Sequence, residues 1–211
     1  MKGGIVAFCI NWLIQSLMKS KLVHTIRHYN QKGWSPATST NYSFRDKEGI
    51  WVTRSGIDKS EIIEDDFILV DFNSQAIGKY EGIKPSAETQ IHCDIYKLFP
   101  EAKVILHSHG KYPVLCSTKN EDSIAFEGFE VQKGFKGQIT HDNLVRIPIF
   151  DNSQEMSFFT HQLSKDLNKL ENSCFIIRQH GTYAWGDTLF EAKRHLETLD
   201  YLCECWWEQN N

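Results

Sequence analysis

Several familiar signals are missing from this sequence, and each absence excludes a class of protein. No apolar run reaches the ~18 residues that a membrane-spanning helix needs, so we expect no membrane among its partners. Basic residues do not outnumber acidic ones: 23 Lys and Arg stand against 27 Asp and Glu, for a net charge of −4. A broad nucleic-acid-binding surface needs clustered basic charge, so we expect no nucleic acid either, whereas a local anion pocket is compatible with this composition.

Cysteine pairs of the CxxC type are also missing. The six cysteines are scattered over 211 residues, and this distribution favours reduced thiols in a reducing compartment over a disulfide framework. Cys203 and Cys205 form a CxC inside a helical pattern, which we interpret as helix packing plus one exposed thiol. We therefore expect a cytoplasmic protein.

Internal repeats, low-complexity tracts and linkers rich in Pro or Ser are absent too, which predicts one continuous domain of medium size. The N-terminus is less clear. Residues 5–17 are mostly apolar but lack a clean cleavage site and run into Met18 and its polar neighbours, unlike a secretory signal. We treat residues 1–17 as an N-terminal extension, either docked, frayed or ahead of a start at Met18, and residues 18–211 as the main domain.

The clearest secondary-structure pattern lies at the C-terminus. Thr188 and Glu191 form a capping-box pattern. Apolar residues from Leu189 to Trp206 then recur at spacings of three and four, which predicts one long helix with a single apolar stripe.

Shorter patterns upstream predict a mixture of helices and strands. Helical spacing predicts helices at 19–32, 86–98 and 153–170, and Ser86 is the expected cap of the second. This order of elements predicts a layered α/β domain. Short runs of strand-forming residues predict strands at Tyr42–Arg45, Gly49–Thr53, Phe67–Asp71, Lys103–His109, Val145–Ile149 and Phe175–Arg178.

Three of the nine histidines carry a pattern typical of metal binding. His107 and His109 end a predicted strand, where residues i and i+2 point to the same face and can hold one ion. His180 ends a second apolar run, and like His109 it is followed directly by glycine. Three protein ligands with a vacant position is the pattern of catalytic zinc, whereas structural zinc is usually four-coordinate and rich in cysteine. The alternative is histidines satisfied by ordinary hydrogen bonds.

The remaining histidines are weaker candidates. His24 and His28 form an i,i+4 pair, but the glutamate and third ligand of a zincin-like arrangement are missing, so we interpret them as helix-surface residues. The other four are isolated, and we assign no chemistry to them: His92, His141, His161 and His195.

An acid or base and an anion site complete the candidate chemistry. Glu88, early in a predicted helix, and Glu130 are the candidate carboxylates, although most glutamates are solvated surface groups. Turns rich in hydroxyl and amide groups at 40–43 and 53–56, together with Ser86, suit a small phosphate. Ordinary turn and cap chemistry is the alternative interpretation of these turns.

The order of these pieces resembles the class II aldolase/epimerase family of sugar-phosphate enzymes. Within that family, EVQKGFKGQITHDNLVRIPIFDNSQ resembles the methylthioribulose-1-phosphate dehydratases, and its QKG and IPIFDN segments distinguish this subgroup. The stretches that match the family lie in its order between residues 34 and 205: SPATSTNYSFR, GIWVTRSGIDK, DDFILVDF, KPSAETQIHCDIYK, AKVILHSHG and FIIRQHGTYAWGDTLFEAKRHLETLDYLCE.

The resemblance implies a fold and a site. The fold is a three-layer α/β/α class II aldolase-like catalytic domain with a central mixed, largely antiparallel sheet, in a homotetramer whose sites lie near subunit boundaries. The acid/base of the aldolases corresponds to Glu88, and the acid/base of the dehydratases corresponds to Glu130. This chain has both glutamates. We favour Glu130 as the base and Glu88 as a substrate contact. The implied ligands of one Zn²⁺ per subunit are His107, His109 and His180, and the implied phosphate contacts are Asn41, Ser55, Gly56 and Ser86.

The implied activity is a zinc-dependent dehydration. It converts 5-methylthioribulose 1-phosphate to 5-methylthio-2,3-dioxopentyl phosphate and water, a step of methionine salvage. Two alternatives stay open. One is an aldolase or epimerase that acts on another sugar phosphate, because Glu88 occupies the aldolase acid/base position. The other is a scaffold protein with this fold and no catalysis.

Overall fold

An eight-stranded mixed sheet runs through the computed structural model, which describes the backbone of residues 2–211 and the side chains of residues 13–155 and 158–211. The strand order is β3-β2-β1-β4-β8-β7-β6-β5, and every neighbouring pair is antiparallel except β6 with β7. The strands are β1 (Tyr42–Arg45), β2 (Ile50–Thr53), β3 (Phe67–Val70), β4 (Val104–Ser108), β5 (Ser123–Phe126), β6 (Val145–Phe150), β7 (Cys174–Ile177) and β8 (Gly181–Gly186).

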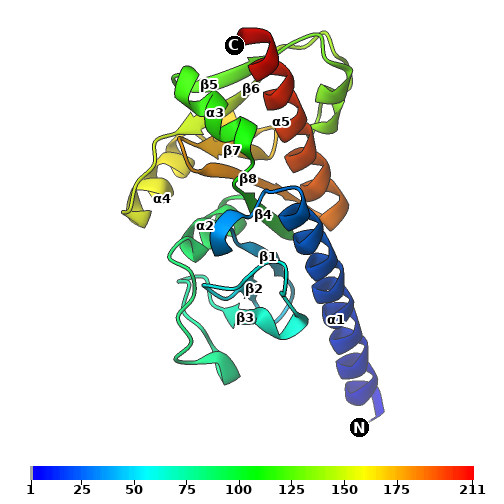
Figure 1. Cartoon of the computed structure of the whole chain (residues 1–211). Helices are drawn as coiled ribbons and strands as arrows, with labels where there is room; N and C mark the ends of the chain where they lie inside the picture. Colours follow the sequence, from blue (N-terminus) through cyan, green and yellow to red (C-terminus); the bar gives the residue numbers. More distant parts are fainter. Residues whose placement is uncertain (1) are drawn as a thin grey trace.

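Helices cover both faces of this sheet. Figure 1 shows α1 and α5 on one side and α2 and α4 on the other. Each side has its own apolar core: on β4, Val104 and Leu106 pack into the core under α1, α3 and α5, whereas Ile105 packs into the core under α2 and α4. The three-layer α/β/α prediction is therefore confirmed. The helices are α1 (Lys2–Gln31), α2 (Thr89–Leu98), α3 (Lys111–Lys119), α4 (Met156–Lys165) and α5 (Leu189–Asn210).

All six predicted strands and all four predicted helices are present, with shifted ends. The Thr188 half of the predicted capping box of α5 forms, since the Thr188 hydroxyl accepts a hydrogen bond from the Glu191 amide at 3.2 Å. Ser86 is not the cap of α2, because that helix begins at Thr89 and Glu88 occupies the N-cap position. The helix predicted at 153–170 is α4 followed by a separate 3₁₀ turn.

Three elements were not predicted. α3 contains Pro113 and lacks a clear apolar stripe, β8 is bounded by Gly181 and Gly186, and β5 is a four-residue edge strand. The first helix is also longer than expected, because α1 crosses the boundary drawn between residues 17 and 18. The division into an extension and a main domain stays a prediction.

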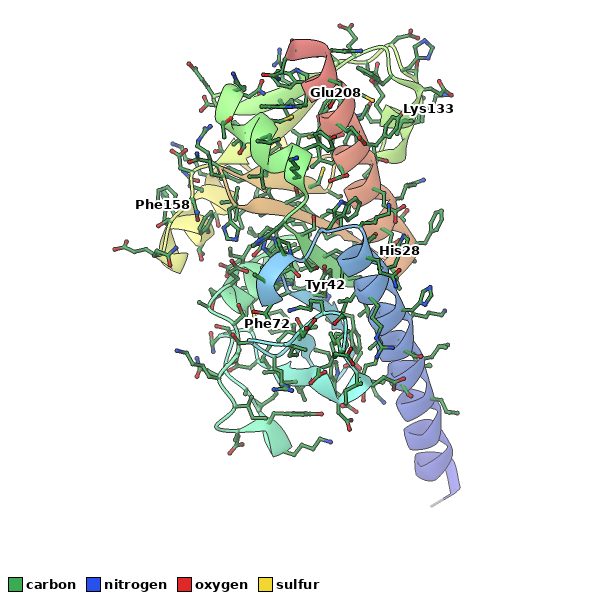
Figure 2. The ribbon with its side chains drawn as sticks, viewed as in Figure 1. His28, Tyr42, Phe72, Lys133, Phe158 and Glu208 are labelled. Atoms are coloured by element: carbon green, nitrogen blue, oxygen red, sulfur yellow. The ribbon has the colours of Figure 1, made fainter. Side chains whose placement is uncertain are left out.

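The register of the sheet places four chain segments at one edge. The start of β1 lies beside the ends of β2 and β4, because the Tyr42 amide donates to the Thr53 hydroxyl at 3.1 Å and Tyr42 pairs with Leu106. The tight turn between β7 and β8 joins them, since Ser108 at the end of β4 pairs with Thr182. Figure 2 shows Tyr42 near the middle of the molecule.

None of the helices in the described part of the chain combines the length and the apolarity required to cross a membrane.

Replacement of Leu196 by alanine tests the packing of α5 on the sheet. Leu196 is fully buried in the core under α5, so Leu196→Ala is expected to lower the free energy of unfolding by about 2–5 kcal/mol. Leu144, which is 51% exposed, is the matched control, and its alanine variant is expected to change stability by about 0.5 kcal/mol or less. Urea unfolding at equal protein concentration measures both, and equal losses would contradict this account of the core.

Candidate metal centre

Three imidazoles converge at this edge of the sheet. His107 lies on β4, His109 follows that strand, and His180 lies in the turn between β7 and β8. One ring nitrogen of each lies within 4.8 Å of the others, and the ring centroids are separated by 4.8, 5.2 and 4.9 Å. The structure thus brings together the three histidines that the sequence pattern singled out.

Backbone contacts fix the position and the tautomer of His107. Its Nδ1–H donates to the Thr182 carbonyl at 3.0 Å, so Nε2 is the unprotonated nitrogen that can bind a metal ion, and it faces Nε2 of His109 at 2.9 Å. The amides of His107 and His109 donate to the carbonyls of Asn41 and Trp34 at 3.1 and 2.8 Å. The strand that carries the first two ligands is therefore held against the loop that precedes β1.

Glycine at position 181 is required by this convergence. A Cβ there would lie 2.3 Å from the Ser108 carbonyl oxygen and 2.8 Å from Cδ2 of His109. Any side chain would push β8 away from β4 and carry His180 with it. The His-Gly pattern in the sequence thus reflects a close approach of two strands.

Burial keeps His107 and His109 neutral. Burial lowers the pKa of His107 well below its usual value and lowers that of His109 to about 4. Because a metal competes with protons for imidazole nitrogens, ligands that are already deprotonated at neutral pH favour binding. His180 is more exposed and is oriented by Asn152, whose Oδ1 lies 3.3 Å from His180 Nδ1. Three imidazole nitrogen donors without a thiolate fit a catalytic divalent metal site.

Glu88 is the carboxylate that reaches the three histidines. Its Oε1 lies 2.8 Å from Nε2 of His180, and its Oε2 lies 3.5 Å from Nε2 of His107. The Asn41 amide donates to the same Oε2 at 2.5 Å. Burial raises the pKa of Glu88, but the hydrogen bonds and the imidazoles outweigh burial, so the pKa is lowered and the group is a carboxylate at neutral pH.

A second layer of residues supports Asn41 and Glu88. The Asn41 side-chain oxygen bonds to His92 Nε2, and His92 Nδ1 lies 2.7 Å from the Ser43 hydroxyl. His92 is completely buried. The sequence pattern offers no reason to select it, because its partners lie about 50 positions away in the chain.

Tyr183 was missed by sequence reasoning. Its ring stacks on His107 with centroids 4.1 Å apart and planes 16° apart. Burial and then the neighbouring Glu88 charge raise the pKa of its hydroxyl, so the phenol is protonated. Because β4 and β8 pair His107 with Tyr183, recognition of β8 as a strand would have been the signal.

Asn41, one of the four predicted phosphate contacts, lies in the loop before β1 and bonds to Glu88. The other three fall in two further places. Ser55 and Gly56 form the turn after β2, where Gly56 adopts a φ of +77°. Ser86 lies before α2, and its hydroxyl accepts from the Glu88 amide at 3.4 Å. In the part of the chain that the structure describes, no hydrogen bond joins the two groups. Their shared role stays a prediction.

Glu130 lies outside the histidine cluster. It begins a 3₁₀ turn (Glu130–Gly134), is 71% exposed, pairs with Lys133 and lies 3.4 Å from His141. Figure 2 shows Lys133 at the upper right edge of the molecule, away from Tyr42 at the start of β1. Within one chain the structure therefore brings Glu88, and not Glu130, to the three imidazoles.

Comparison with known proteins defines the class. The model of the class II aldolase and adducin N-terminal domain matches residues 20–207, and the chain belongs to this family. Solved structures share its fold: a putative aldolase/epimerase/decarboxylase from Escherichia coli has a TM-score of 0.79 at 17% identity, covering 94% of this chain and 92% of that one. L-Fuculose 1-phosphate aldolase has a TM-score of 0.76 at 19% identity, covering 93% and 87%.

Closer relatives are known by sequence. A methylthioribulose-1-phosphate dehydratase from Picosynechococcus sp. is 46% identical over 194 residues, which cover 90% of this chain and 92% of the relative. A protein of the same name from Xanthomonas oryzae pv. oryzae is 39% identical, covering 87% of this chain and 82% of the relative.

Loss of His107 should remove the metal. His107→Ala deletes a buried ligand, so the purified variant is expected to hold less than a tenth of the metal bound by the wild type, measured by elemental analysis after dialysis. The control is His161→Ala, because His161 is exposed on α4 outside the cluster. Full metal content in His107→Ala would rule out this site.

Proposed function

We propose that this protein is a metal-dependent dehydratase of methionine salvage. Its substrate is 5-methylthioribulose 1-phosphate, and its products are 5-methylthio-2,3-dioxopentyl phosphate and water. The observation that carries the proposal is the cluster of three imidazoles beside a carboxylate, in a chain 46% identical to a protein named for this reaction.

The proposed metal is Zn²⁺, one per chain, held by His107, His109 and His180. Three imidazole donors support zinc in a catalytic role. When bound, the ion supplies a Lewis acid that stabilises negative charge on the oxygens of the substrate.

The chain itself must move one proton and release one hydroxyl. A carboxylate removes the proton from C3, the hydroxyl on C4 leaves as water, and the resulting enol becomes the 2,3-diketone. A positioned general base contributes about 10²–10⁴-fold to such a step. The base must therefore have an oxygen free to approach C3.

Glu130 is the proposed base, and it serves the site of a neighbouring subunit in a homotetramer. Its exposure at the surface supports a role across a subunit boundary. Both oxygens of Glu88 already contact the ligand histidines or Asn41, which supports a role in holding the substrate and the ligands. We also propose that the protein is cytoplasmic. The five described cysteines support this location, because all of them are free thiols.

A second candidate function is an aldolase or epimerase reaction on another sugar phosphate. The position of Glu88 against the histidines favours it, because a base there would serve carbon–carbon cleavage after the same proton abstraction. The two candidates differ in their products, so one assay separates them.

The dehydratase reaction is tested directly with the ketose phosphate. Zinc-loaded protein is expected to form the diketone, and a chelator is expected to lower the rate at least 100-fold, with recovery on addition of zinc. Retro-aldol products from a fuculose or ribulose phosphate, without diketone, would favour the second candidate. No turnover of any sugar phosphate by zinc-loaded protein would favour a scaffold.

The role of Glu130 is tested by an isosteric change. Glu130→Gln is expected to lower kcat by about 10²–10⁴-fold with zinc still bound. Glu127→Gln, at an exposed position nearby, should leave kcat unchanged. Glu88→Gln is expected to raise KM more than it lowers kcat. Near-normal turnover in Glu130→Gln, with turnover lost in Glu88→Gln, reverses the assignment.

Mixing inactive subunits tests action across the boundary. Glu130→Gln and His107→Ala chains, refolded together in equal amounts, should regain activity. About a quarter of the sites would then combine an intact histidine cluster with an intact Glu130 from the neighbour. No recovery in a mixed tetramer would show that both groups act within one chain.

A further inference from the structure

Lys59 is a buried cation for which the metal centre gives no explanation. Its side chain is 1% exposed, although lysine is almost never fully buried unless it is paired. Among the residues that the structure describes, no carboxylate lies within ion-pair distance of its ammonium group. Burial lowers the pKa of Lys59 to about 8, so the group is still mostly protonated at neutral pH.

The ammonium group joins two loops at the sheet edge that carries the histidines. It donates to the carbonyl of Thr38, in the loop before β1, at 3.2 Å, and to the carbonyl of Ile57, in the turn after β2, at 3.0 Å. An ammonium has three N–H donors. The third has no acceptor among the described residues.

These two loops present further donors without acceptors. The backbone is left-handed at Ala37, Thr38 and Thr40, with φ of 52°, 63° and 71°, and at Gly56. Successive amides in such conformations form concave sites for anions. In the described part of the chain, the amides of Thr40, Ser55 and Gly56 donate to no protein group. The Ser39 hydroxyl is enclosed and also has no partner.

The same loops lie next to the metal centre. The segment from Trp34 to Asn41 accepts backbone hydrogen bonds from His109 and His107. The charge of Lys59 also contributes to lowering the pKa of His109, which places the ammonium within electrostatic range of that ring. An anion held by these loops would therefore lie beside a ligand bound at the metal.

We propose that Lys59 supplies the positive charge that selects an anionic, phosphorylated substrate, acting from beneath the loops at residues 37–41 and 54–57. The loops provide hydrogen-bond donors, and the charge of Arg54 within them is balanced by its ion pair with Asp66 at 2.8 Å. An enclosed cation favours a dianion over a neutral group. The choice of a phosphate ester as the anion rests on the proposed function. The role of Lys59 is that of a positioning residue, because its ammonium lies behind the backbone that touches the anion.

Binding of inorganic phosphate to the zinc-loaded protein tests this role without any turnover. Lys59→Gln keeps N–H donors for the two carbonyls but removes the charge. It is expected to weaken phosphate binding, measured by calorimetry, at least tenfold, with zinc content and melting temperature unchanged. Lys47→Met, at an exposed position, is the control and should bind phosphate as the wild type does. Phosphate affinity within twofold of the wild type in Lys59→Gln overturns the proposal.

Salt dependence separates charge from packing. Added sodium chloride should weaken phosphate binding to the wild type more steeply than to Lys59→Gln, and Lys59→Arg, which retains the charge, should keep the steep dependence. In catalysis, kcat/KM should fall at least tenfold for the phosphorylated ketose but stay within twofold for its dephosphorylated form. A loss of equal size for both substrates would show that Lys59 only supports the fold.

A measurement on the wild type covers the case in which Lys59→Gln does not fold. Inorganic phosphate should slow hydrogen exchange of the backbone amides at residues 37–41 and 54–57 in the zinc-loaded protein. Unchanged exchange in both segments at saturating phosphate overturns the proposal, whatever the dehydratase assay shows. Phosphate binding with protection, but without diketone formation from the ketose, would leave the role of Lys59 standing and remove the proposed reaction.

Discussion

The close approach of β4 and β8 is the constraint on which the candidate site depends. Two ligands come from the end of β4 and the third from the turn that leads into β8, so the three imidazoles meet only if these strands pair in their observed register. Gly181 permits that approach, because a Cβ would collide with the Ser108 carbonyl. The same pairing stacks Tyr183 on His107 and lets the Thr182 carbonyl select its tautomer. The stacking of Tyr183 on His107 and the convergence of the three imidazoles thus both follow from the register in which β4 and β8 pair.

The features that could be predicted from sequence are those encoded locally. The His107-Ser108-His109 spacing, the glycine after His180 and the capping box at Thr188 each involve neighbours in the chain, so a short stretch of sequence is enough to reveal them. The start of α2 was predicted too early, with Ser86 as its cap; the N-cap is Glu88, whose side chain contacts the site. β8 was missed because glycines at both ends are typical of turns.

The contacts that could not be predicted join distant segments. Asn41 meets Glu88 and His92 only when the loop before β1 packs on α2, and no local pattern encodes that meeting. Lys59 has the same difficulty, since a lysine in a polar loop is typical of an exposed residue, whereas here it is enclosed between two loops. Glu130 was assigned by resemblance alone, and its exposed position in one chain leaves its role to an assembly of several chains.

The candidate metal ligands and the other proposed site residues come from separate segments of the chain. The histidines come from β4, from the residue that follows it and from the β7–β8 turn. The loops proposed to bind the anion flank β1 and β2, and the two candidate carboxylates lie at the N-cap of α2 and in a surface 3₁₀ turn. Solved structures at 17–19% identity share this fold. In our proposal, the dehydratase uses Glu130 as the base where the aldolase alternative would use Glu88, and the same three histidines hold the metal in both.

Anomalous diffraction at the zinc absorption edge from crystals of the metal-loaded protein tests the central claim most directly. The account predicts one strong peak per chain within about 2.0–2.1 Å of an imidazole nitrogen of each of His107, His109 and His180. A zinc peak at any other place would contradict it. So would the absence of a peak between the three imidazoles when zinc is in excess.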